Sequence, residues 1–229
     1  AGSTNKRTHR PQGGAAVGAH MVSVMETEAL KIGVDLRKNS KVIDIIKEEN
    51  KPAGVVVETN GQRYTIAAKA VIIATGGFGA NPDMVVKYKP ELEGFGTTNH
   101  KGATGDAFAW IEKFGGALTQ MDEIQTHPTV VPGNGLMITE AVRGNGAIMV
   151  NREGNRFCSE MATRDVMSKA ILNQTGKTAY LVFDMGVRKS LKAIEGYVKQ
   201  GLLTEGETPE ALAQKLGIPA ESFASTIGR

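Results

Sequence analysis

The chain of 229 residues is long enough for one large domain or two modest ones, and its 41% hydrophobic content allows a buried core. Its formal charge of +3 is spread along the sequence and only 5% of residues are aromatic, which argues against nucleic acid as a partner. No apolar run is long enough to cross a membrane, and the single cysteine, Cys158, excludes an internal disulfide and a cysteine-rich metal site.

The first predicted helix covers residues 17–30, where apolar side chains recur at helical spacing, and Gly33 ends it. Gly13, Gly14 and Ala15 lead into this helix. Small residues at a helix start allow backbone N–H groups to approach a phosphate, although close packing of a helix on a sheet produces the same pattern.

Short β-rich runs follow, at 34–37, 41–47, 54–58 and 63–66. The last two flank Asn60-Gly61, a strong signal for a hairpin turn. The continuous apolar run at 70–74 predicts a strand buried on both faces, as in a parallel sheet. It leads into Thr75, Gly76 and Gly77, and α/β sheets bind ligands at such carboxyl ends of strands.

A polar turn at 97–106 precedes a predicted helix over 107–114, which the glycines at 115 and 116 end. Asp106 is placed to cap this helix or to contact a ligand, and helix-start physics alone does not separate the two roles.

From residue 121 onward the sequence predicts a second part with mixed helices and short strands. Strands are expected at 147–150 and 180–184. A tight polar turn at 151–155 follows the first strand, and residues 156–160 return from this turn. Thr163 is a good N-cap for a helix over 164–172, and two further helices begin near Thr208 and Pro219.

Between His127 and Arg164 the sequence concentrates polar groups suited to an anionic substrate. If 139–143 forms one helical turn, Thr139, Glu140 and Arg143 share one face, because they lie three and four residues apart. A Glu/Arg pair at this spacing is more often an exposed surface pair, and a lone histidine is more often structural.

Several strings together resemble the soluble fumarate reductase flavoprotein family, which includes the flavocytochrome c fumarate reductases. The resemblance covers essentially the whole chain and rests on residues 4–11, 13–15, 73–78, 98–100, 102–106, 127–129, 139–144, 150–154 and 163–165.

The resemblance implies an α/β fold: a partial FAD-binding, Rossmann-like domain over 1–120, followed by an α+β capping, or clamp, domain over 121–229. The glycine-fingerprint βαβ unit of the family is missing, as is the later stretch that carries a second His and Arg. The chain opens on Ala1 without an initiator Met and stops at Arg229 just after a predicted helix, so we expect an internal fragment.

The resemblance also implies site residues. His127 and Thr139 are similar to ligands of one substrate carboxylate, Arg164 to the proton donor, and Glu140 and Arg143 to the relay that reprotonates it. FAD is the implied cofactor and no metal is implied. The segments similar to flavin contacts contain Gly13, Gly14, Ala15, Val42, Thr75, Gly76, Gly77 and Asp106.

The implied reaction, part of anaerobic respiration, reduces fumarate to succinate by hydride transfer from reduced flavin, with an arginine supplying the proton. Arginine is an unusual acid because its free pKa exceeds 12. We expect the pKa of Arg164 to be lowered by the helix N-terminus that Thr163 caps and by the neighbouring Arg143.

Three alternatives stay open. The same scaffold serves urocanate and other enoate reductases, although the residues at His127 and Glu140 are of the fumarate type. An isolated capping module would be folded and inactive. A phosphate- or nucleic-acid-binding domain would use Lys6, Arg7 and Arg10, and its binding would depend on salt.

The resemblance places the electron donor, a heme or flavin domain or protein, outside this chain, because no Cys-x-x-Cys-His motif is present. Family members occur in the periplasm or the cytoplasm, with a slight lean here to the periplasm.

Overall fold

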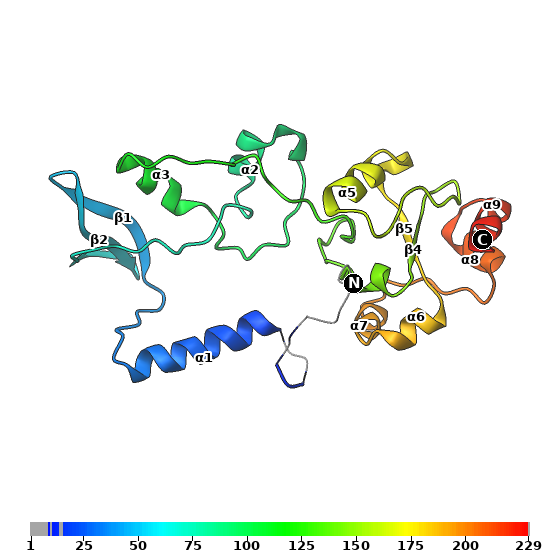
Figure 1. Ribbon diagram of the computed structural model, residues 1–229, viewed down its shortest axis with the longest axis horizontal. Coiled ribbons are helices and arrows are strands. Elements are labelled where there is room, and N and C mark those ends of the chain that lie inside the picture. Colours follow the sequence, from blue (N-terminus) through cyan, green and yellow to red (C-terminus); the bar gives the residue numbers. More distant parts are fainter. Residues whose placement is uncertain (1–8, 10, 14–15, 229) are drawn as a thin grey trace. The chain divides into compact units, whose positions relative to one another are not determined.

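The computed structural model describes residues 9, 11–13 and 16–228 (Figure 1). These residues fall into two compact units, which we describe separately. The N-terminal unit holds the described residues up to 94 together with 99–122, and the C-terminal unit holds 95–98 and 123–228. Five residues named above as candidate ligand contacts, Lys6, Arg7, Arg10, Gly14 and Ala15, lie outside the described residues.

A three-stranded antiparallel sheet forms the β structure of the N-terminal unit. Its strands are β1 (Lys41–Glu48), β2 (Lys51–Thr59) and β3 (Gln62–Ala67), in the order β1-β2-β3. The predicted turn at Asn60-Gly61 is confirmed, because both residues have positive φ, 51° and 75°, as a type I′ turn requires. Ile45 and Val57 supply the buried apolar side chains of this sheet.

Helices α1 (Val17–Lys31), α2 (Pro82–Tyr88) and α3 (Asp106–Lys113) belong to the same unit, with a 3₁₀ turn at Pro90–Leu92. The predicted helix over 17–30 is confirmed as α1. The Nζ of Lys113, in the last turn of α3, lies 2.8 Å from both carboxylate oxygens of Asp44 and from the carbonyl oxygen of Ile45. This side chain therefore ties α3 to the edge strand β1.

Two predicted strands are absent. Residues 34–37 form an irregular segment in which Arg37 pairs with Asp35 two residues away. Residues 70–74 are neither a strand nor buried, and the side chain of Ile72 is 92% exposed. An apolar run becomes a buried strand only where neighbouring strands bond to both of its edges, and no described strand pairs with this run.

Asp106 is the first residue of α3 and not its N-cap, which corrects the capping expectation. The cap position belongs to Gly105, whose φ of 76° is left-handed, and the Asp106 carboxylate accepts a hydrogen bond from Thr104 Oγ1 at 2.8 Å. The helix ends as predicted, because Phe114 is its C-cap and Gly115 follows with φ 78°.

The C-terminal unit is built around a two-stranded antiparallel sheet of β4 (Ile148–Val150) and β5 (Tyr180–Val182). The predicted strands at 147–150 and 180–184 are thus confirmed in shorter form. Its helices are α4 (Ala141–Gly144), α5 (Arg164–Leu172), α6 (Met185–Ser190), α7 (Ala193–Lys199), α8 (Pro209–Leu216) and α9 (Ala220–Ile227), with a 3₁₀ turn at Thr175–Lys177.

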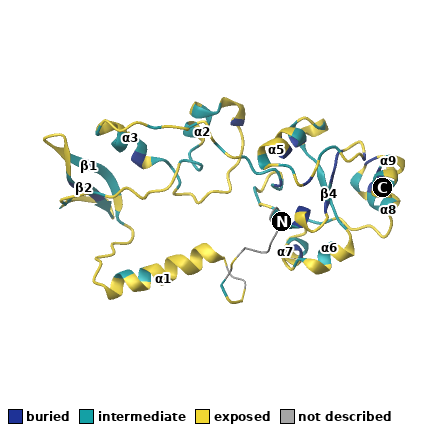
Figure 2. Ribbon diagram, in the orientation of Figure 1, coloured by how far each residue is buried: buried dark blue, intermediate teal, exposed yellow. Residues whose placement is uncertain are grey.

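Strand β4 distributes its side chains to different parts of the core, as the twofold alternation of a strand requires. Val150 packs with Phe223, Ala213 and Ile218 of the α8–α9 region. Its neighbour Met149 packs with Met167 of α5 in a separate cluster. Figure 2 shows buried residues of this unit in β4 and in short segments of the helices around it.

A third apolar cluster lies beneath α4. It contains the buried residues Val142, Ala147 and Ile194, with Tyr197 of α7 among the partly buried side chains around it. This cluster anchors α4, which carries Arg143 and begins directly after Glu140. Within the described residues, no helix combines the length and apolar character that a membrane span requires.

The fold predicts one sharp effect of substitution in the β-sheet. Gly54 of β2 is buried with φ 157°, and a Cβ placed on it would overlap the carbonyl oxygen of Ile66 on β3. We expect Gly54→Ala to lower the free energy of unfolding by about 2 kcal/mol in urea denaturation.

Gly18→Ala is the matched control, because Gly18 lies in the exposed helix α1 with no atom near its would-be Cβ. This change should leave stability unchanged or raise it by up to about 1 kcal/mol. Equal effects of the two substitutions would contradict the register of β2 and β3.

Candidate functional site

A small hairpin in the C-terminal unit brings the first two predicted site residues, His127 and Thr139, to its two ends. The N–H of Ile138 donates to the carbonyl oxygen of Thr129 at 2.9 Å, and Thr129 Oγ1 donates back to the Ile138 carbonyl oxygen at 2.8 Å. Val130 and Met137 form an isolated antiparallel bridge one step further along. His127 and Thr139 therefore lie on two chain segments that are paired side by side, although the loop between them separates them in the sequence.

The Glu140 carboxylate is the centre of the cluster. Its Oε1 accepts a hydrogen bond from Arg164 Nε at 2.6 Å and lies 3.5 Å from Arg143 Nη2. Arg164 is the first residue of α5, and Arg143 lies in the single turn α4. One carboxylate oxygen thus links two guanidiniums that strand β4 and its flanking loops separate in the sequence.

Arg164 is held by a second group that the sequence reasoning missed. Its Nη1 donates to Gln125 Oε1 at 2.5 Å, while its Nε is engaged by Glu140. Among the described residues, no hydrogen bond to Nη2 is observed. Because a guanidinium is a rigid planar fork, these two anchors fix the direction in which Nη2 points.

The expectation of a lowered pKa for Arg164 is wrong. The hydrogen bond to Glu140 raises the pKa of this guanidinium above its ordinary value, which outweighs the opposing effect of partial burial. The same hydrogen bond is the main reason why the pKa of Glu140 is lowered. A direct ion pair at 2.6 Å therefore dominates over the helix N-terminus, whose effect is worth only about 0.3–1 kcal/mol at exposed sites.

Arg143 is the arginine whose pKa is lowered, because burial disfavours its charge. Its side chain is only 5% exposed. Nη1 donates to the carbonyl oxygen of Glu160 at 2.6 Å and lies 2.7 Å from Met167 Sδ, while Nε is buried without a partner. A buried charge with an incomplete hydrogen-bond set is costly and depends strongly on its few fixed partners.

Glu160 is the second residue that the sequence reasoning missed. Its buried carboxylate accepts hydrogen bonds from the N–H of Met149 at 2.9 Å and from Arg156 Nε and Nη2 at 2.9 and 2.5 Å. Burial alone would raise the pKa of Glu160, but these hydrogen bonds outweigh it, and the pKa lies below its ordinary value. Residues 156–160 are not helical, so no helical spacing in the sequence marked this pair.

His127 is neutral in this environment. Burial lowers the pKa of its imidazole, and the nearby Arg164 and Arg143 add to that effect while Glu140 opposes it. The N–H of Thr129 approaches Nδ1 at 3.3 Å, so Nδ1 is the acceptor and the ring proton resides on Nε2. His127 therefore presents a neutral N–H donor.

The predicted cofactor contacts that the structure describes lie in the N-terminal unit, and part of them are brought together. The N–H of Gly105 donates to the carbonyl oxygen of Gly77 at 3.1 Å, which places the segment Thr75–Gly76–Gly77 beside Asp106 at the start of α3. Val42 lies on β1 opposite Val57, and Gly13 lies in an exposed turn.

Thr75, Gly76 and Gly77 are exposed, Gly76 has φ 79°, and no atom lies within 4 Å of a would-be Cβ on either glycine. Such a segment presents bare backbone to a ligand that must approach closely. The residues present therefore fit a cofactor contact at this point.

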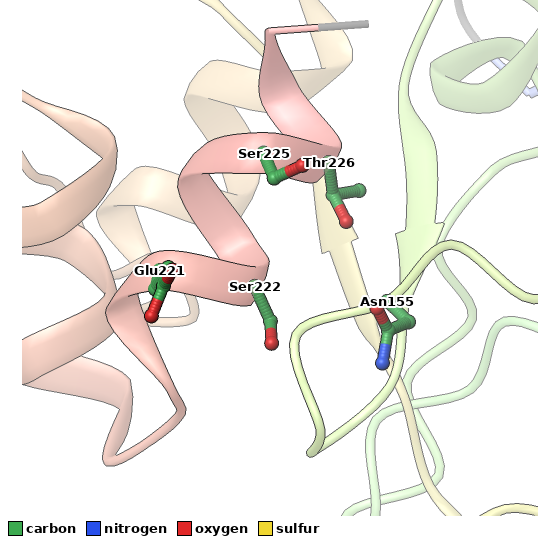
Figure 3. Close-up of a pocket in the computed structure, with 5 residues that line it drawn as sticks. All are labelled: Asn155, Glu221, Ser222, Ser225 and Thr226. Carbon is green, nitrogen blue, oxygen red and sulfur yellow. The ribbon is translucent and has the colours of Figure 1, made fainter.

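A separate polar pocket lies elsewhere in the C-terminal unit (Figure 3). It has a volume of about 280 Å³ and is lined by Asn155, Glu221, Ser222, Ser225 and Thr226. It shares no residue with the cluster around Glu140, and the Glu221 carboxylate makes it unsuited to an anion. Among the described residues, no group of three or more His, Cys, Asp or Glu side chains is placed to hold a metal ion.

Comparison with known proteins identifies the class: residues 1–229 match the FAD binding domain family, and the chain belongs to this family. The chain is 46% identical over 230 residues to a fumarate reductase (cytochrome) of Shewanella frigidimarina, an alignment that covers 100% of this chain and 40% of the relative. It is 34% identical over 230 residues to a urocanate reductase of Eggerthella lenta, covering 95% of this chain and 38% of the relative.

Among solved structures, the open conformation of a flavocytochrome c3 fumarate reductase superposes with a TM-score of 0.78 and 38% identity, covering 97% of this chain and 40% of that chain. These comparisons confirm the resemblance to fumarate reductase flavoproteins, the FAD-binding fold class and FAD as the cofactor of the family. The chain spans about two fifths of the length of these relatives.

The Glu160 network predicts a specific dependence of stability on pH. Because the pKa of Glu160 is lower in the folded state than its ordinary value of 4.5, the folded protein binds fewer protons than the unfolded chain in this range. The stabilisation is therefore complete above pH 4.5 and is lost as the pH falls through the folded-state pKa. We expect Glu160→Gln to lower the free energy of unfolding by about 2 kcal/mol at pH 7.

The difference between wild type and Glu160→Gln should shrink as urea unfolding is measured at successively lower pH below 4.5. Glu153→Gln, in the exposed turn before Glu160, is the control and should change stability by less than about 0.5 kcal/mol. If the difference in free energy of unfolding between wild type and Glu160→Gln stayed constant down to pH 3, the charge of the Glu160 carboxylate would not contribute to stability.

Proposed function

We propose that the protein to which this chain belongs reduces fumarate to succinate, and that the cluster around Glu140 in the C-terminal unit delivers the proton. The observation that supports this most strongly is the continuous path from Arg164 Nε to Glu140 Oε1 to Arg143 Nη2, at 2.6 and 3.5 Å. Paired guanidiniums around one carboxylate suit both an anionic substrate and proton movement.

His127 and Thr139 are proposed to bind one carboxylate of the substrate. The neutral imidazole offers an N–H donor at Nε2, since Nδ1 accepts from the N–H of Thr129. The Thr139 hydroxyl oxygen receives the N–H of Ala141 at 3.4 Å, which leaves its hydrogen to be donated outward. Two donors at the ends of one hairpin match the two oxygens of a carboxylate.

Arg164 is proposed as the proton donor. Its raised pKa means that it is fully protonated before the reaction and therefore carries the proton that the reaction consumes. Gln125 and Glu140 hold Nη1 and Nε, so Nη2 is the nitrogen placed to donate to the alkene carbon. The cationic group also stabilises negative charge as it develops on the substrate.

Glu140 and Arg143 are proposed to return a proton to Arg164. The Glu140 side chain is 39% exposed, so it exchanges protons with water, whereas Arg143 is buried. As Arg164 becomes neutral, the interaction that lowers the pKa of Glu140 weakens, and Glu140 takes up a proton more readily at that moment. The coupling therefore favours reprotonation only after the donor has been used.

The exposed segment Thr75–Gly77 and Asp106 are proposed to hold FAD, together with Gly13, Gly14, Ala15 and Val42. When bound, FAD supplies the hydride that is added to one alkene carbon while Arg164 protonates the other. We further propose that residues 1–120 belong to the FAD-binding domain and 121–229 to the capping domain, and that electrons arrive from a heme or flavin donor outside this chain.

Urocanate reduction is the second candidate, because a urocanate reductase is 34% identical to the chain. His127, Thr139 and Glu140 favour fumarate, since a small dicarboxylate needs donors at this end and not room for an imidazole ring. Steady-state rates of the FAD-loaded full-length protein with both substrates decide between them. Higher kcat/KM with urocanate, or no succinate formed from fumarate, would overturn the proposal.

The role of Arg164 is tested by Arg164→Lys in the full-length protein. The lysine keeps a positive charge for substrate binding. It lacks the three guanidinium nitrogens with which Arg164 can bond Glu140 and Gln125 and still donate a proton. We expect KM for fumarate to change by less than about fivefold and kcat to fall about 10³-fold.

Arg63→Lys is the matched control, because Arg63 Nε also bonds a single carboxylate, that of Glu58, at 2.8 Å but on the hairpin of the N-terminal unit. It should retain wild-type kcat. A kcat for Arg164→Lys within a factor of ten of wild type would remove Arg164 from the mechanism.

A further inference from the structure

A tyrosine outside every motif described above contacts the backbone of the proposed site. The backbone N–H of Thr139 donates to the hydroxyl oxygen of Tyr197 at 3.0 Å, across 58 residues of sequence. Thr139 lies two residues before α4, on the N-terminal side of its N-cap Glu140, so its N–H has no partner within that helix. The partner of this N–H is therefore a side chain from the distant helix α7.

The position of the Tyr197 ring is fixed by the core. It packs against the cluster of Val142, Ala147 and Ile194, and Ile194 lies one turn earlier in α7 with no exposed surface. The Tyr197 carbonyl oxygen also accepts the N–H of Leu202 at 3.1 Å. The phenol oxygen is thus a rigid acceptor that the core holds in one place.

The same cluster anchors the chain before and after Glu140, at Thr139 and at Val142. Val142 belongs to the cluster directly, while Thr139 is bound to it through the Tyr197 hydroxyl. Between them the N–H of Val142 donates to the Thr139 carbonyl oxygen at 3.1 Å. Movement of Thr139 away from α7 would therefore require the hydrogen bond between the Thr139 N–H and the Tyr197 hydroxyl to break.

We infer that Tyr197 is a positioning residue for Thr139, and that it holds the Thr139 hydroxyl in place to bind a substrate carboxylate. The inference rests on the proposed function, since it is that function which makes Thr139 a substrate ligand. Tyr197 acts through Thr139 and is not itself placed in the catalytic machinery.

The test is Tyr197→Phe in the FAD-loaded full-length protein. This variant removes one oxygen atom and keeps the ring in the core. We expect KM for fumarate to rise about fivefold, the factor that corresponds to one neutral hydrogen bond, with kcat changed by less than twofold. The pH profile of kcat should stay unchanged, because the Arg164–Glu140–Arg143 path is left intact.

Tyr180→Phe is the matched control. Tyr180 is also partly buried in the C-terminal unit, and its hydroxyl donates to the carbonyl oxygen of Leu216 at 3.2 Å, which lies in α8 and outside the site. It should leave KM and kcat at wild-type values. An unchanged KM for Tyr197→Phe, or an equal rise for Tyr180→Phe, would overturn the inference.

A second measurement needs no substrate. Hydrogen exchange of the Thr139 amide should be slowed in the wild-type protein, and Tyr197→Phe should accelerate it about fivefold while Tyr180→Phe does not. Exchange of this amide at the unprotected rate in wild type would overturn the inference even if the variant fails to fold. A protected amide in a protein that does not reduce fumarate would instead refute the proposed function alone.

Discussion

The arrangement of the candidate site depends on one carboxylate shared by two guanidiniums. Glu140 Oε1 accepts from Arg164 Nε at 2.6 Å and lies 3.5 Å from Arg143 Nη2, so both guanidiniums act on the charge of one carboxylate. The pairing keeps Glu140 ionised and Arg164 protonated, as the opposite directions of their pKa shifts indicate. In the proposed mechanism, loss of a proton from Arg164 would raise the proton affinity of Glu140 and so couple donation to reprotonation.

The surrounding fold places these charges by anchoring them to buried groups on both sides. Arg143 is fixed by the Glu160 carbonyl oxygen, and the Glu160 carboxylate is fixed in turn by the N–H of Met149 in β4. Because Met149 and its neighbour Val150 enter different apolar clusters, β4 cannot shift without disturbing both. The partly exposed carboxylate of Glu140 is thus held by Arg143, and Arg143 is held by Glu160; the side chains of both are buried.

Local signals were sufficient for much of the fold. The helix over 164–172 and the Asn60-Gly61 hairpin were predicted because caps, turn residues and periodicity act over a few residues. The strand predicted at 70–74 is not formed, since a buried strand depends on partners distant in sequence. Residues of the candidate site were named through family resemblance, and the structure groups five of them in the C-terminal unit, whereas the assignment of their roles stays a proposal.

What the sequence could not supply was the set of tertiary partners. The pKa of Arg164 was expected to fall because its sequence neighbours suggested a helix N-terminus, yet an ion pair from 24 residues away reverses the sign. Gln125 and Tyr197 carry no motif that marks them as neighbours of Arg164 and Thr139.

The most direct test of the shared Glu140 carboxylate is a ¹³C NMR titration of the Glu140 carboxyl carbon. The account predicts a midpoint below 4.5 that rises when Arg164 is replaced by glutamine, whereas a wild-type midpoint at or above 4.5 would contradict it.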